Sequence, residues 1–114
     1  MSFSEFELKR IDKLIGTFCR NRVPERARDQ LRYSYRVEGQ NVIVAEERNR
    51  RGKQEGWVPL DIARFRYVKS TRRWKLYWMR ISGKWQLYEP CNENKNLETL
   101  IEAIGKDTYG CFFG

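Results

Sequence analysis

Residues 63–88 read ARFRYVKSTRRWKLYWMRISGKWQLY, and this stretch decides the fold. Apolar and polar side chains alternate through 63–68, again through 74–79, and over a shorter run at 85–88. Such alternation is typical of strands that bury one face and expose the other. Residues 69–72 and 82–83 supply turns, and Pro90 ends the last run. The stretch therefore predicts an antiparallel meander of three strands.

Two more strands are predicted upstream of the meander. Residues 31–37 alternate in the same way, and residues 42–48 follow them after a turn at 38–41, so the two runs should form a hairpin. Residues 49–57 are polar and contain two glycines, which predicts an exposed loop. Trp57, at the end of this loop, is expected to act as a lid or a contact residue.

Helical patterns flank the strands. Residues 3–20 carry apolar side chains at helical spacing, with Ser4 and Glu7 placed for a capping box and Phe3 and Leu8 for a hydrophobic staple. Residues 96–105 form a second helical pattern that ends at Gly105. These elements predict an α+β fold, a two-layer sandwich in which an antiparallel sheet of about five strands carries an N-terminal and a C-terminal helix on one face. No repeat or linker divides the 114 residues, so we expect one domain over 1–114.

Alternation also assigns each strand residue to a face of the sheet, because successive side chains point to opposite sides. The apolar set is expected to face the helices and to form the core. It consists of Leu31, Tyr33, Tyr35, Val37, Val42, Val44, Phe65, Tyr67, Trp74, Leu76, Trp78, Trp85 and Leu87.

The opposite face of the sheet is expected to be exposed and basic. The chain has 23 Lys and Arg against 15 Asp and Glu, for a net charge of +8, and residues 20–88 hold 18 basic and 7 acidic residues. Two helices do not easily cover both sides of a five-stranded sheet, so this face should stay open to solvent. Its predicted polyanion-binding residues are Arg32, Arg36, Arg64, Arg66, Lys75, Tyr77, Lys84 and Tyr88, with Val68 and Met79 among them.

Several kinds of chemistry are disfavoured by the sequence. Histidine is absent, which removes the usual proton shuttle and the commonest metal ligand. Cys19, Cys91 and Cys111 form no C-x-x-C motif, which indicates small buried thiols in a reducing cytoplasm. No phosphate-binding glycine loop, nucleophile elbow or metal-ligand cluster is found, and no apolar run is long enough to cross a bilayer. We expect no catalytic residue, no metal or cofactor and no membrane partner.

Two functions fit the predicted surface. The first is non-catalytic binding of nucleic acid or another polyanion, in which arginines hold phosphates and tyrosines stack on bases. The alternative is a protein-interaction or homodimerisation module with no nucleic-acid role, built on an apolar centre with an arginine rim. The terminal pair Phe112 and Phe113 either folds back on its own chain or docks into a neighbouring subunit. Catalysis is the least favoured function.

Three stretches carry a resemblance to a known family: residues 3–11 (FSEFELKRI), residues 74–90 with WKLYWMR, Trp85 and YEP, and residues 109–114 (YGCFFG). Together they resemble a family of short bacterial proteins classed only as a domain of unknown function. The resemblance covers nearly the whole chain and implies a bacterial, stand-alone, cytoplasmic domain. It implies no activity, cofactor or catalytic residue.

Overall fold

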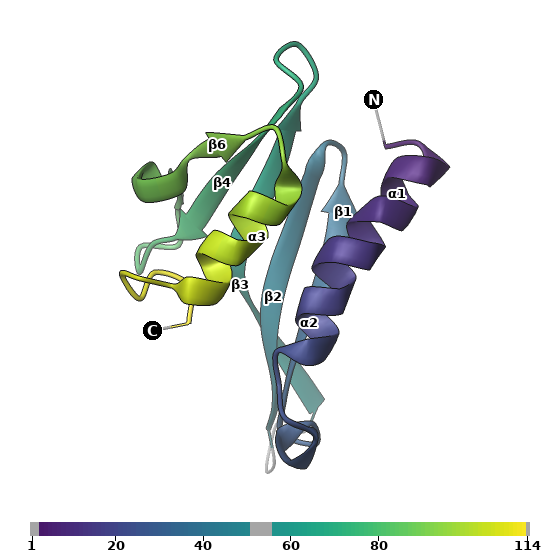
Figure 1. The fold of residues 1–114 in the computed structure, drawn as a ribbon. Coiled ribbons are helices and arrows are strands. Elements are labelled where there is room, and N and C mark those ends of the chain that lie inside the picture. The colour runs from purple at the N-terminus through teal and green to yellow at the C-terminus, as the bar shows by residue number, and fades with distance from the viewer. Residues whose placement is uncertain (1–2, 51–55, 114) are drawn as a thin grey trace.

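A two-layer α+β arrangement is seen in the computed structural model, which describes residues 3–50 and 56–113 (Figure 1). The strands pair antiparallel in chain order: β1 (Leu31–Glu38), β2 (Asn41–Arg50), β3 (Gly56–Val68), β4 (Arg73–Met79) and β5 (Trp85–Leu87). The two-residue β6 (Glu93–Asn94) pairs with β4. The predicted fold class, with a helix at each end of an antiparallel sheet, is confirmed.

The N-terminal helix starts where the sequence predicts. The side chain of Ser4 accepts a hydrogen bond from the Glu7 N–H at 3.2 Å, and the Glu7 carboxylate accepts one from the Ser4 N–H at 2.8 Å. The helix then runs through α1 (Glu5–Ile11), a π-helical turn (Asp12–Gly16) and α2 (Thr17–Asn21). Leu8 is exposed, whereas Phe3 is buried and stacks on Trp74 with ring centroids 5.6 Å apart. Phe3 therefore anchors the start of the helix, and Ile11 and Ile15 anchor its middle.

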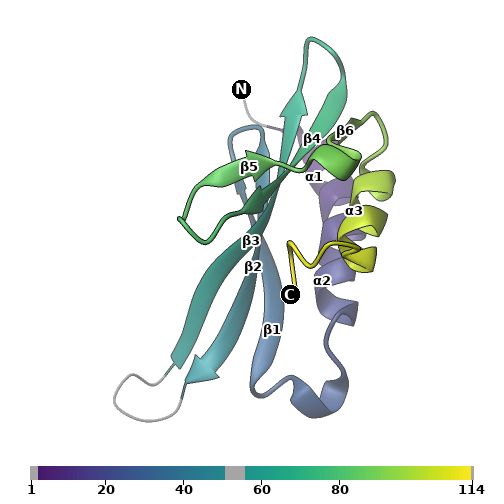
Figure 2. The same ribbon diagram turned by 90° about the vertical axis from the view of Figure 1, so that its left-hand side faces the viewer.

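Both helical segments lie on the same side of the sheet (Figure 2). The C-terminal helix α3 (Leu97–Lys106) meets the N-terminal one through an ion pair of 3.0 Å between Arg10 and Glu98. The core between the layers contains the inward-predicted side chains of β1–β4 except Leu31, and it contains neither Trp85 nor Leu87. Its most buried large side chains are Phe65, Leu76, Val42 and Val44 from the sheet and Ile11, Ile15, Leu100 and Ile104 from the helices.

Strand β3 is much longer than predicted. Residues 56 and 57, and the end of β2 up to Arg50, are strand, so the predicted loop over 49–57 is wrong at both ends; residues 51–55 lie outside the described part of the chain. The register between β2 and β3 pairs Val44 with Ala63 but Ala45 with Asp61, which leaves Ile62 as an extra residue. A bulge of this kind changes the alternation. Trp57 and Asp61 therefore lie on the sheet face away from the helices, which we call the outer face.

The last residues fold back against the core. Gly105 is not the helix terminator; Asp107 takes the left-handed conformation (φ 43°). The Asp107 carboxylate accepts hydrogen bonds from the N–H groups of Phe112 and Phe113, at 3.0 and 2.8 Å. A glycine at this position could also take the left-handed conformation that ends the helix. It has no carboxylate, however, and could not hold the following segment.

The two terminal phenylalanines occupy separate places in the core. Phe112 packs on Tyr88, with ring centroids 4.9 Å apart. Phe113 meets the ring of Tyr33 edge to face at 5.4 Å and lies 3.9 Å below the guanidinium of Arg22. Of the two alternatives for this pair, folding back on its own chain is confirmed.

Replacing Asp107 tests this arrangement. Asp107→Ala should lower the free energy of unfolding by about 1–3 kcal/mol, because two N–H groups in a partly buried segment lose their acceptor. Asp107→Asn, which retains one side-chain oxygen and tolerates the left-handed conformation, should cost less. Equilibrium unfolding in urea measures both. Equal stability of Asp107→Ala and the parent protein would show that the carboxylate does not hold the segment.

Candidate nucleic-acid interface

The outer face of the sheet carries no helix among the described residues (Figure 2). One row of register partners crosses it from strand to strand: Arg36, Ile43, Arg64, Tyr77 and Leu87. Ile43 is only 6% exposed although it faces away from the helices, consistent with cover from the arginine side chains on either side of it. The predicted residues Arg32, Arg36, Arg64, Arg66, Lys75 and Tyr77 all belong to this face.

Two of the predicted site residues do not belong to it. Tyr88 is 3% exposed and packs in the core against Phe112; burial raises its pKa. Lys84 lies in the turn before β5, where its carbonyl accepts a hydrogen bond from the Arg80 N–H at 2.9 Å. The prediction that Tyr88 lies on the exposed face is therefore wrong.

The misplacement of Tyr88 has the same cause as that of Trp85 and Leu87. Trp85 pairs with Met79 and Leu87 pairs with Tyr77, so both point to the outer face and Tyr88 points inward. A shift of one residue in the alternation moves a whole strand's side chains to the other face. The outer face thus gains the half-buried ring of Trp85 in place of Tyr88.

The β1 side of the outer face is neutralised. Arg32 pairs with Glu47 at 2.8 Å, and its guanidinium lies 3.9 Å above the ring of Trp57. Arg36 donates two hydrogen bonds to Asp61, at 2.8 and 2.9 Å, and these bonds raise the pKa of Arg36 above the usual arginine value. It also pairs with Glu38 at 3.1 Å. These two predicted binding residues are already paired with carboxylates of the same chain.

Trp57 therefore lies on the sheet surface beneath a cation. The predicted placement of Trp57 in an exposed loop is wrong, because Trp57 belongs to β3 and pairs in register with Asn49. Its role as a contact residue stays a prediction.

The β3–β4 side of the outer face keeps its charge. Four cations gather there: Arg64, Arg66, Arg73 and Lys75, which we call the β3–β4 basic patch. Arg64 donates to the Asn41 side chain at 2.9 Å and lies 5.0 Å from the ring centroid of Tyr77. None of the four has a carboxylate oxygen within 4 Å among the residues that the structure describes, although Glu93 is the register partner of Lys75. Sequence reasoning missed Arg73, although its alternation with Trp74 signals the outer face.

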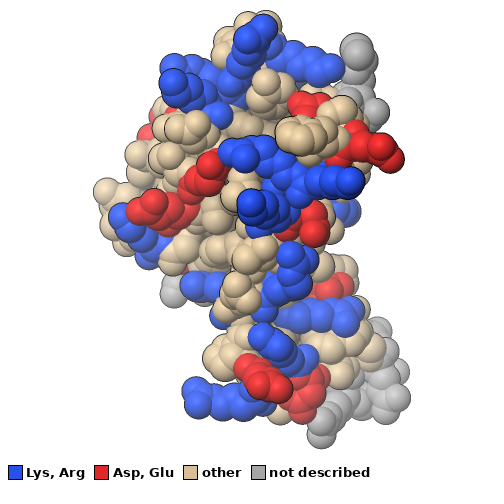
Figure 3. Space-filling view, turned by 45° about the vertical axis from the view of Figure 1, so that its right-hand side comes forward, with Lys and Arg blue, Asp and Glu red and all other residues tan. Residues whose placement is uncertain are grey.

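Basic side chains also gather on the side of the molecule that carries the N-terminal helix, with acidic ones among them (Figure 3). Arg20 pairs there with Asp12 at 3.5 Å. Lys9 and Lys13 are exposed on this helix and serve as a charge-matched comparison for the β3–β4 basic patch.

Two of the three thiols, those of Cys19 and Cys111, are poorly suited to nucleophilic chemistry. Burial raises the pKa of Cys19 to about 12, and burial followed by the charge of Asp107 raises that of Cys111. Both therefore remain protonated at neutral pH, and the thiolate is the reactive form. Within residues 3–50 and 56–113, no three His, Cys, Asp or Glu side chains are grouped to hold a metal ion. In the same ranges no helix has the length and apolar character to cross a membrane.

A double-mutant cycle tests the division of the outer face. Arg36→Ala and Asp61→Ala should couple by about 0.5–1 kcal/mol in the free energy of unfolding, falling with added salt, because the pair is bidentate but partly exposed. The same cycle with Arg66→Ala and Asp61→Ala should give a coupling near zero. If the coupling free energy of Arg36 and Asp61 were zero at every salt concentration, the pair would contribute nothing to stability and the proposed division of the face would be wrong.

Comparison with known proteins identifies the family. No curated protein and no solved structure matches the chain. A family model described as a domain of unknown function (DUF3024) matches residues 3–114. This match takes in both helices, every strand of the sheet and the C-terminal segment held by Asp107. The chain therefore belongs to the family of this domain of unknown function.

Proposed function

We propose that the outer face binds single-stranded nucleic acid, with the β3–β4 basic patch holding phosphates and the rings of Tyr77 and Trp85 stacking on bases. The observation that carries this proposal is that four cations lie beside two outward-facing aromatic rings on one face of the sheet. Among the described residues, these cations have no ion-pair partner and this face carries no helix. Cationic grooves with aromatic platforms are the common means of binding single strands.

The spacing of the cations suits an extended backbone. Arg64 and Arg66 are two residues apart on β3, which places them about 7 Å apart along the strand, and their partners on β4 lie about 5 Å to the side. An extended sugar-phosphate chain that crosses these strands can therefore meet several cations in succession. Phosphate contacts of this kind contribute affinity without sequence preference.

The rings favour a single strand over a duplex. Trp85 and Tyr77 lie on neighbouring strands at the β5 end of the patch, and Tyr77 already contacts the guanidinium of Arg64. To stack on such a ring, a base must present one of its own faces. In a duplex, the neighbouring base pairs cover the faces of each base. Stacking contributes about 1–3 kcal/mol per base in single-strand binders.

A second function, protein interaction, is favoured by a different observation. The apolar centre predicted for the outer face loses Tyr88 to the core and gains Trp85 and Leu87, so its composition differs from the prediction. Residues 56–61 of β3, however, have no strand beside them on the side opposite β2 in the described chain.

The charge contribution is tested with matched double variants. Arg64→Ala/Arg66→Ala should weaken binding of a fluorescein-labelled oligothymidine at least tenfold in a polarisation assay, whereas Lys9→Ala/Lys13→Ala should change it less than twofold. Because Arg64 is partly buried, Arg66→Ala/Arg73→Ala serves as a second test with both side chains exposed. With four phosphates neutralised, log affinity should fall with log salt at a slope of about −3. If the patch variants and the helix variant lost affinity equally, binding would depend on net charge alone and the proposed site would be refuted.

The stacking contribution is tested at Trp85. Trp85→Ala should weaken oligothymidine binding by about 5- to 100-fold, the equivalent of one stacked base, and Trp85→Phe should restore most of it. Affinity for a duplex of the same length should change little, since it rests on the cations. Unchanged single-strand affinity in Trp85→Ala would remove the aromatic part of the proposal and leave a general polyanion surface.

A further inference from the structure

Strand β3 has a free edge over half of its length. Strand β4 ends at Met79 and pairs only with residues 63–68, so residues 56–61 have β2 on one side and no strand on the other within the described chain. We infer that this edge is a docking site for an extended acidic peptide, which adds to the sheet as a further strand. The site is separate from the β3–β4 basic patch and does not depend on nucleic-acid binding.

The backbone groups at this edge point away from β2. The Asn49 N–H donates to the Gln30 carbonyl at 2.9 Å, so this residue of β2 directs its peptide groups to the side of β1. Peptide groups alternate along an antiparallel strand, so the even residues of β2 bond to β3 and their partners are 56, 58 and 60. Trp57, Pro59 and Asp61 therefore direct their backbone groups away from β2, toward the free edge of the sheet. Trp57 and Asp61 each present an N–H donor there. No backbone hydrogen bond joins these donors to another described residue.

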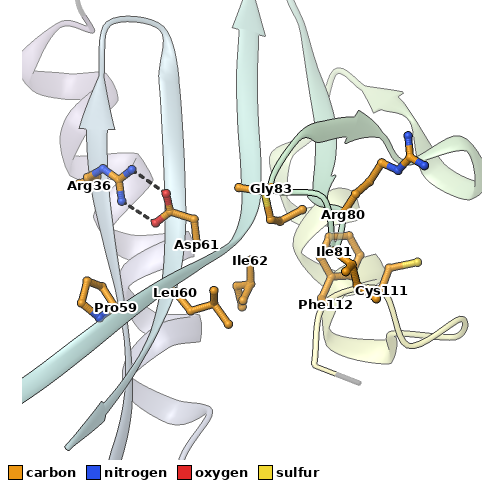
Figure 4. A pocket seen from close by; sticks show the side chains of 11 residues that line it. Arg36, Pro59, Leu60, Asp61, Ile62, Arg80, Ile81, Gly83, Cys111 and Phe112 are labelled. Carbon is orange, nitrogen blue, oxygen red and sulfur yellow. Dashed lines mark hydrogen bonds and ion pairs between the residues drawn. The ribbon is translucent and has the colours of Figure 1, made fainter.

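Beside this edge lies a hollow of about 760 Å³ (Figure 4). Its lining includes Leu60 and Ile62 of β3, Met79 at the end of β4, Ile81 in the following turn, and Phe112 of the C-terminal segment. Leu60 is 61% exposed and Ile81 fully exposed. Alternate side chains of an added strand would enter this hollow, and exposed apolar side chains of this kind gain the most from being covered.

Charge distinguishes the partner from a second copy of this chain. Arg80 lines the hollow and Lys84 lies in the same turn, and within the described part of the chain neither has an ion pair. Two copies would bring these cations together in a chain of net charge +8, and would also place two Pro59 residues, which have no N–H, along the same edge. An acidic peptide with its full set of donors avoids both penalties.

A random 12-residue peptide library displayed on phage tests the proposal on the full chain. The parent protein and Phe6→Ser, an exposed apolar control on α1, should both enrich peptides in which apolar and acidic residues alternate. Leu60→Ser/Ile81→Ser, which changes two exposed side chains without changing the charge, should lose this enrichment. A synthetic copy of the selected peptide should bind this variant at least tenfold more weakly than the parent protein. The Arg64→Ala/Arg66→Ala variant, deficient in the proposed oligonucleotide binding, should bind the peptide as the parent does.

Hydrogen exchange distinguishes strand addition from simple charge attraction. The amides of Trp57 and Asp61 should exchange at least tenfold more slowly with the peptide bound, whereas a peptide attracted only by charge would leave them unchanged. Failure to enrich alternating acidic peptides, equal enrichment on Leu60→Ser/Ile81→Ser, or unchanged exchange at both amides would each overturn the inference. So would a dimer of the parent protein in analytical ultracentrifugation that Leu60→Ser abolishes, since the edge would then belong to a second copy.

Discussion

The extra residue in β3 at Ile62 determines what the outer face contains. On one side of the bulge, residues 64, 66 and 68 point outward, and on the other side residues 57, 59 and 61 do so. Without the bulge, Asp61 would point toward the helices, where an unpaired carboxylate is costly to bury. With it, Asp61 meets Arg36 and Trp57 lies beneath Arg32. The Arg36–Asp61 pair and the position of Trp57 beneath Arg32 both follow from this one irregularity in strand pairing.

Net charge describes this surface poorly. The two arginines of β1 are paired with carboxylates that adjacent strands bring to the same face, whereas the cations of β3 and β4 have no such partners among the described residues. The positive field of the face is therefore concentrated at the β4 end, beside Tyr77 and Trp85. Local pairing, rather than the overall count of basic residues, determines where an anion is attracted most strongly.

Much of the fold follows from patterns that the sequence displays directly. The capping box at Ser4 and Glu7, the turn at residues 38–41 and the alternation in β1, β2 and the paired half of β3 depend on neighbouring residues, so they could be predicted. Strand β5 could not be oriented, because Trp85 and Leu87 on one face and Tyr88 on the other are all apolar and the strand has only three residues. The bulge has no local signature, so neither the Asp61–Arg36 pair nor the position of Trp57 could be derived. Both depend on a register between strands far apart in sequence.

The order of β1 to β5 in the sheet follows their order in the chain, so each of these pairings closes only a short loop at low entropic cost. The helical layer that covers the sheet is assembled from segments far apart in the chain. The helices come from opposite ends of the chain and meet through the Arg10–Glu98 ion pair and through the shared core. Hairpins can therefore form early and independently, whereas completion of the hydrophobic interior couples the first and last segments in one cooperative step. Loss of either segment would uncover apolar surface on the same side of the sheet, and this exposed surface would promote aggregation of the protein.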